Sequence, residues 1–198
     1  MGTLSNAFKS VLLDTWPMIV LSCSVLIIIR LAYLIKNKQK FSIGNEIMML
    51  TFIVYVLCLF QIVTSQDVSG VHGINVTLFR ELTRYQIGSK LFYRNIVGNI
   101  IMFIPFGFFT SFYLKLDKKR IIFYLTLIIS VIIEFIQLKI GRAFDVDDII
   151  LNVVGGMLGY LLYRVMDKIF GDLSDTVKGT FIVIGILLTI VILTLIII

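Results

Sequence analysis

The stretch Ile121–Ile140, IIFYLTLIISVIIEFIQLKI, decides the fold because it is almost wholly apolar and long enough to cross a bilayer. A helix needs roughly 20 such residues to span the hydrocarbon core, and a backbone in lipid must satisfy its hydrogen bonds within its own segment. The run is too long for a strand and shows no strict alternation. We therefore predict a transmembrane helix.

Other apolar runs of similar length precede and follow this one: Pro17–Ile35, Ile47–Thr64, Tyr93–Leu114, Ile149–Met166 and Thr180–Ile198. The chain has 198 residues and is 59% hydrophobic, whereas soluble domains are about half apolar. The sequence predicts an all-α fold, a polytopic transmembrane helix bundle of about six helices that forms a small single domain. It also predicts membrane lipids as partners, and it leaves the oligomeric state open.

The apolar runs suggest four segments. Residues 1–16 form an N-terminal segment that could lie at the membrane interface, and residues 17–44 hold the first transmembrane helix and a basic loop. Residues 45–166 form the central membrane domain. Residues 167–198 hold a loop and a C-terminal transmembrane helix, which we expect to be a lipid-facing anchor because it carries no charge.

The basic residues of the connections fall unevenly on the two sides of the predicted membrane. One side collects Arg30, Lys36, Lys38, Lys40, Lys115, Lys118, Lys119, Arg120, Arg164, Lys168 and Lys178; the other collects Lys9, Arg80, Arg84, Lys90, Arg94, Lys139 and Arg142. Loops rich in Lys and Arg stay in the cytoplasm, so we place the first side inside and both termini outside. This bias also explains the net charge of +6 without a nucleic-acid partner.

Ionisable groups inside a membrane are costly, and each one is a functional hypothesis. Arg30 lies near the inner end of its helix, and we expect its long side chain to reach the interface. Glu134 lies 14 residues beyond Arg120, roughly 21 Å along a helix, which is in the outer half of the bilayer. Its short side chain must face a polar cavity, pair with a cation or be protonated.

Other polar side chains are predicted at the level of Glu134. Ser130, Glu134 and Gln137 have the i, i+4, i+7 spacing of one helix face. Two further pairs are four residues apart on their own helices, Asn95 with Asn99 and Asp148 with Asn152. The loop between the last two helices of the central domain adds Arg142, Asp145 and Asp147. We predict a ligand-binding site formed by Asn95, Asn99, Glu134, Gln137, Arg142, Asp145, Asp148 and Asn152.

Other interpretations remain open for parts of this cluster. Asp145 or Asp147 could cap the following helix, where acids complement the helix dipole, and amides can join helices without any chemistry. We expect four residues to be structural. Gly155 and Gly159 let helices approach closely, and Pro105 and Gly107 favour a kink. The single histidine, His72, is interpreted as a surface residue of the long connection Ser65–Phe92.

Two blocks of this sequence resemble the VanZ-like family. The first is Arg94–Gly107, RNIVGNIIMFIPFG; the second is Glu134–Gln137, EFIQ, followed by Gly141–Gly155, GRAFDVDDIILNVVG. Order, spacing and chemistry match over roughly residues 45–166. The resemblance implies a multi-pass protein of the bacterial cytoplasmic membrane. It also implies a role like that of the family's namesake, which lowers susceptibility to the lipoglycopeptide antibiotic teicoplanin.

Three functions are compatible with the sequence. The first is a non-enzymatic protein whose outward polar site binds the headgroup of a lipid, a cell-wall precursor or the lipoglycopeptide itself, with Arg142 pairing with phosphate or carboxylate. The second is an enzyme acting on a lipid-linked envelope substrate, with Glu134 and Asp148 as candidate catalytic groups. In that case Asp145, Asp147 and Asp148 could hold a divalent cation, the one cofactor considered. The third, a transporter, is least favoured because the inner helix halves offer only isolated polar residues.

Overall fold

The computed structural model describes residues 3–37, 43–65, 73–79 and 83–170. These residues belong to two compact units, Met1–Ser65 with Asp172–Ile198 and Gln66–Gly171. Each unit is described separately. The predicted C-terminal helix Thr180–Ile198 and the predicted surface residue His72 lie outside the described residues.

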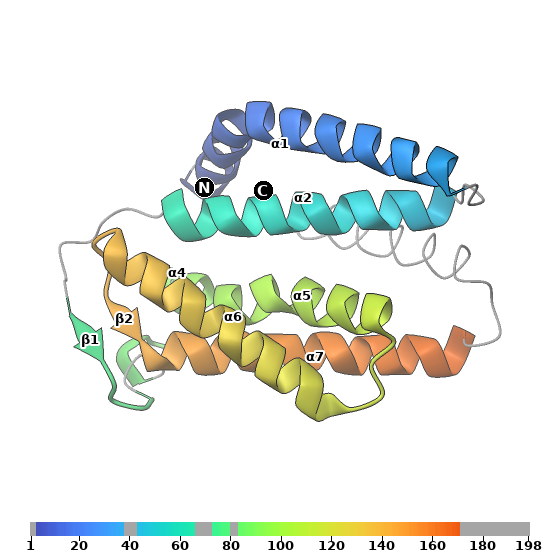
Figure 1. Cartoon of the computed structure of the whole chain (residues 1–198). Coiled ribbons are helices and arrows are strands. Elements are labelled where there is room, and N and C mark those ends of the chain that lie inside the picture. The colour runs from blue at the N-terminus through green and yellow to red at the C-terminus, as the bar shows by residue number, and fades with distance from the viewer. Residues whose placement is uncertain (1–2, 38–42, 66–72, 80–82, 171–198) are drawn as a thin grey trace. The chain divides into compact units, whose positions relative to one another are not determined.

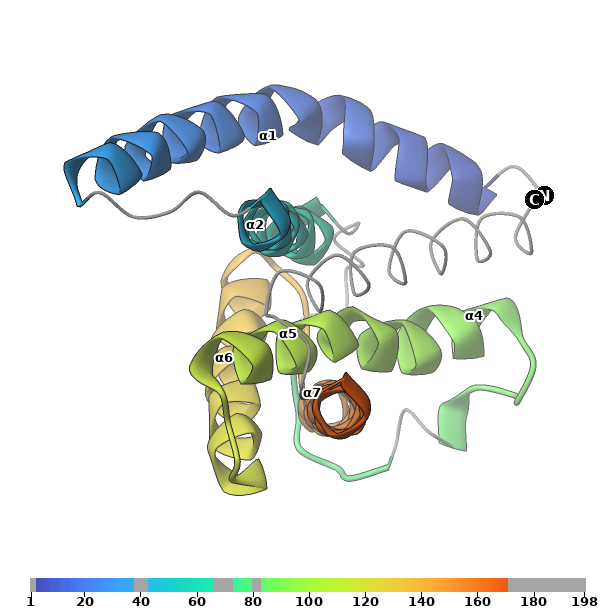
Figure 2. The same cartoon turned by 90° about the vertical axis from the view of Figure 1, so that its right-hand side faces the viewer.

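The first unit contains a hairpin of two long helices, α1 (Thr3–Lys36) and α2 (Ile43–Ser65). Figure 1 shows α1 folding back along α2, and Figure 2 shows that α1 is curved. α1 includes the predicted N-terminal segment from Thr3 onward and the first apolar run, with Pro17 inside it. Near the connection, the Arg30 guanidinium forms an ion pair with Glu46, with 3.0 Å between Nε and Oε2. Arg30 therefore pairs with an acid of α2. From the sequence, we expected its side chain to reach the interface and did not predict this partner.

The second unit contains the helices of the central membrane domain. Its elements are β1 (Ile74–Asn75), α4 (Lys90–Phe92), a π-helix η1 (Tyr93–Val97), α5 (Gly98–Leu114), α6 (Lys119–Lys139), β2 (Phe144–Asp145) and α7 (Val146–Phe170). Figure 2 looks almost along α7, and α5 crosses over it. The buried apolar side chains include Phe103 and Phe109 of α5 and Ile122 of α6.

Glycines bring α5 and α7 into backbone contact. A Cβ atom on Gly155 would clash with the carbonyl of Ile100, and one on Gly107 would clash with the backbone of Gly156. A Cβ on Gly159 would likewise overlap the carbonyl of Ile104. Pro105, the other residue expected to be structural, lies inside α5, which continues to Leu114. Only residues without a side chain allow this approach between the two helices.

Four of the six predicted transmembrane helices agree with this structure. Within the described residues, four helical segments are long and apolar enough to cross a membrane, namely Gly44–Thr64, Asn95–Leu114, Lys119–Lys139 and Val146–Ile169. They correspond to the second, third, fourth and fifth predicted runs, and the first run lies inside α1. The all-α transmembrane architecture is thus confirmed for the described part of the chain.

Candidate functional site

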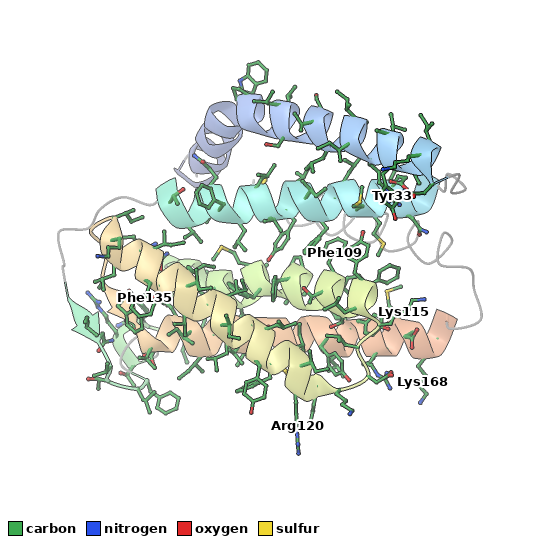
Figure 3. All side chains as sticks on the ribbon, viewed as in Figure 1. Tyr33, Phe109, Lys115, Arg120, Phe135 and Lys168 are labelled. Carbon is green, nitrogen blue, oxygen red and sulfur yellow. The ribbon has the colours of Figure 1, made fainter. Side chains whose placement is uncertain are left out.

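The predicted polar residues of the second unit gather where α6 ends and α7 begins. Figure 3 shows Phe135 near this end of α6, whereas Lys115, Arg120 and Lys168 lie at the opposite end of the same unit. Three basic side chains thus mark one end of the unit, and the predicted acids and amides meet at the other end.

The polar face of α6 is buried against α7. Ser130, Glu134 and Gln137 are exposed by 0%, 1% and 6%, respectively. Asn152 of α7 donates from Nδ2 to Ser130 Oγ over 2.8 Å. One turn further along, Thr126 packs against Gly156 and continues the polar face. Ser130, Glu134 and Gln137 thus share one face of α6, as predicted. This face is a row of polar side chains buried between the two helices.

Glu134 is the final acceptor in a chain of hydrogen bonds that runs from Arg142 through Gln137. Its Oε2 accepts from the backbone N–H of Asp145 at 2.8 Å. The Gln137 amide nitrogen donates to Glu134 Oε1 at 2.9 Å, and the Gln137 amide oxygen accepts from the Arg142 guanidinium. This amide orientation follows from its neighbours, because a guanidinium can only donate. Both oxygens of Glu134 therefore act as acceptors.

Backbone geometry and a hydrogen bond hold the loop that follows α6 against the end of that helix. The backbone N–H of Arg142 donates to the carbonyl of Gln137 at 2.9 Å, and Gly141 has a φ of 90°. This left-handed conformation suits glycine and lets the chain turn sharply at the end of α6. Arg142 is therefore held by both its backbone and its guanidinium.

The loop aspartates join the start of α7 to the long connection before α5. Asp145 Oδ1 accepts from the N–H of Asp147 at 2.9 Å, at the beginning of α7. Asp145 Oδ2 accepts from Asn75 Nδ2 at 2.9 Å, and Asp147 Oδ1 accepts from the N–H of Phe79 at 2.6 Å. Asp145 thus has the capping role that the sequence left open, and it also binds a distant segment.

A short parallel pairing reinforces this attachment. Ile74 and Asn75 of β1 pair with Phe144 and Asp145 of β2, and the N–H of Phe144 donates to the carbonyl of Gly73 at 3.0 Å. The sequence analysis did not identify Asn75 or Phe79 as site residues. Isolated residues in a long connection carry no periodic signal that points to their partners.

The two asparagines predicted on one face belong to different helical segments, Asn95 to η1 and Asn99 to α5. Asn99 Nδ2 donates to Asp148 Oδ1 at 2.6 Å. Asn95 lies within the π-helix, whose hydrogen bonds join residues five apart, as the N–H of Gly98 bonded to Tyr93 O shows. This changes the register by one residue relative to an α-helix. Asn95 is partly exposed, and its side chain forms no hydrogen bond with the residues that the structure describes.

Oxygen ligands for a cation are present, but they do not converge. Within the described ranges, no group of three or more His, Cys, Asp or Glu side chains is placed to hold a metal ion. Asp145, Asp147 and Asp148 each accept a hydrogen bond from a different partner. A divalent cation at these aspartates stays a prediction.

Comparisons with known proteins agree on one family. A family model described as VanZ/LLP1 matches residues 18–167, more than half of the chain. Protein VanZ of Enterococcus faecium is 38% identical over 78 residues, which cover 38% of this chain and 48% of the relative. The matched region therefore spans about half the length of that curated relative. No solved structure matches the chain. The chain belongs to the VanZ/LLP1 family and is a membrane protein.

Proposed function

We propose that this protein lowers susceptibility to lipoglycopeptide antibiotics such as teicoplanin through a polar site that faces outward and binds an anionic headgroup. The headgroup would belong to a lipid, a cell-wall precursor or the drug. Family membership and the similarity to Protein VanZ support the general role. The choice of teicoplanin rests on the VanZ-like resemblance.

The surroundings of Arg142 carry the proposal. Its side chain is partly exposed, and Gln137, itself held by the buried Glu134, accepts from one of its donors. No other hydrogen bond or ion pair joins the Arg142 guanidinium to the described residues. A guanidinium has five N–H donors in a planar fork that suits carboxylate and phosphate. Donors thus remain for an anionic ligand.

Burial divides the predicted site residues into two groups. Glu134 and Asp147 are each only 1% exposed and accept hydrogen bonds from the protein. We assign them the task of positioning the loop and Arg142. The partly exposed side chains are Asn95, Asn99, Asp145 and Asp148, and these are the candidates for ligand contact beside Arg142. This division favours binding over hydrolysis, because a buried Glu134 with both oxygens occupied is poorly placed as a general acid or base.

The charge of the loops supports an outward orientation of the site. The end of the second unit with Lys115, Arg120 and Lys168 is opposite the end with Phe135 (Figure 3). Because Lys- and Arg-rich loops tend to remain in the cytoplasm, we propose that the first end lies inside. Glu134, Arg142 and Asp148 would then lie on the extracytoplasmic side, where a lipoglycopeptide meets its target.

The test compares two substitutions of basic residues that are close in sequence. The parent, Arg142→Gln and Lys139→Gln would be expressed at matched membrane levels in a susceptible Gram-positive host, and susceptibility to teicoplanin and vancomycin measured. Lys139 is exposed at the end of α6 and serves as the control. We expect protection against teicoplanin from the parent and Lys139→Gln but not from Arg142→Gln. If the parent gives no protection, the role is wrong; if Arg142→Gln protects fully, the site is wrong.

A further inference from the structure

An apolar strip continues from the membrane-spanning α6 onto the short sheet. Phe135 is 55% exposed, and its ring centroid lies 5.5 Å from that of Phe144 in β2. Phe144 pairs in register with Ile74 of β1, which is 66% exposed. Since side chains alternate between the two faces of a strand, Ile74 and Phe144 share one face. Their neighbours Asn75 and Asp145 bond to each other on the opposite face.

The strip extends along the residues that follow β1. Val76, Leu78 and Phe79 are exposed by 68%, 55% and 55%. Phe79 has a φ of 63°, a left-handed conformation that is unfavourable for a bulky residue. Its N–H is held by Asp147, so this conformation is fixed to the start of α7. The exposed ring is part of an anchored segment.

We propose that this strip, formed by Phe135, Phe144, Ile74, Val76, Leu78 and Phe79, lies in the lipid interface, at the boundary between headgroups and acyl chains. The proposal does not depend on the proposed function. Isolated exposed apolar residues are common, but contiguous ones mark an interaction surface. The partner is lipid because the strip begins on a helix that is itself long and apolar enough to span the membrane.

Two further features support lipid as the partner. Hydrogen bonds to Asp145 and Asp147 fix the segment at the level where α7 begins, which is the end of a candidate span. In the following segment, the Arg84 guanidinium lies 5.7 Å from the centroid of the Tyr85 ring. Tyrosine is enriched at membrane–water interfaces, and basic side chains extend to them.

Depth-dependent tryptophan quenching tests this proposal. The single native tryptophan, Trp16, would be replaced by Phe. One tryptophan would then be introduced by Ile74→Trp, by Phe79→Trp or, as a control, by Lys118→Trp. Lys118 is exposed in the connection between α5 and α6. The full-length variants would be reconstituted in phosphatidylcholine vesicles whose acyl chains are brominated near the headgroup, and compared with unbrominated vesicles and with added acrylamide.

We expect strong quenching by the brominated lipid and weak quenching by acrylamide for Ile74→Trp and Phe79→Trp, with the reverse for Lys118→Trp. Acrylamide quenching equal to that of the control would place the strip in water and overturn the proposal. Protection from both quenchers would mean that protein covers the strip, which also overturns it. Phe79→Trp exchanges one aromatic residue for another, so it carries the test if Ile74→Trp does not fold.

Discussion

Replacing Glu134 by Gln should destabilise the protein because the hydrogen-bond chain has a fixed direction. The backbone N–H of Asp145 and the amide nitrogen of Gln137 both donate to the Glu134 carboxyl group, and the Arg142 guanidinium donates to the amide oxygen of Gln137. In Glu134→Gln the new amide nitrogen would face a donor. Reversing the Gln137 amide would only move this conflict to Arg142. The new amide leaves one buried polar group without a partner, which costs about 1 to 3 kcal/mol in the free energy of unfolding.

A compensating swap makes this prediction specific. In Glu134→Gln/Gln137→Glu, the amide at position 134 accepts from the N–H of Asp145 and donates to the carboxylate at position 137. That carboxylate accepts directly from Arg142, so every donor again meets an acceptor. Reversible unfolding in mixed micelles, followed by circular dichroism, would measure both variants. A single variant within about 0.5 kcal/mol of the parent, or a swap no more stable than the single variant, would refute the reasoning.

Two further predictions concern packing and the first unit. Gly107→Ala should lower the free energy of unfolding by about 1 to 3 kcal/mol, because the new methyl group would overlap the backbone of Gly156. In the same unfolding assay, the control Gly73→Ala should be nearly neutral, because its methyl group meets no atom within 4 Å. Equal stabilities of the two variants would contradict this account. Arg30→Gln should lower the free energy of unfolding by about 1 to 3 kcal/mol. This lies between the values for exposed and buried ion pairs, since the side chains of Arg30 and Glu46 are 33% and 12% exposed. If adding Glu46→Gln recovers none of this loss of stability, the ion pair is not the cause of the loss.

Local periodicity predicted much of the site. The 3.6-residue repeat of a helix is contained in the sequence itself, so it placed Ser130, Glu134 and Gln137 on one face, and all three are buried on α6. It also placed Asp148 and Asn152 on one face of α7, where each bonds to a neighbouring helix. What periodicity cannot give is the hydrogen-bond partner, because the partner lies on another element.

The features that sequence reasoning missed depend on long-range contacts or on departures from regular helix geometry. Asn75 and Asp145 are separated by 70 residues, and a two-residue strand pair leaves no pattern of its own. Nothing in the spacing of Asn95 and Asn99 indicated the π-helix η1, which contains Asn95. The Arg30–Glu46 pair was missed because the predicted run began at Ile47. The start of α2 at Ile43 places Glu46 inside the helix, opposite Arg30.

Binding of an anionic amphiphile to Arg142 is the most direct test of the central claim. The parent, Arg142→Gln and Lys139→Gln would be purified in detergent, mixed with phosphatidylglycerol or phosphatidylcholine, and examined by native mass spectrometry for retained lipid. The account predicts that the parent and Lys139→Gln retain phosphatidylglycerol in preference to phosphatidylcholine, and that Arg142→Gln loses this preference. An unchanged preference in Arg142→Gln would contradict an anion-binding site at Arg142.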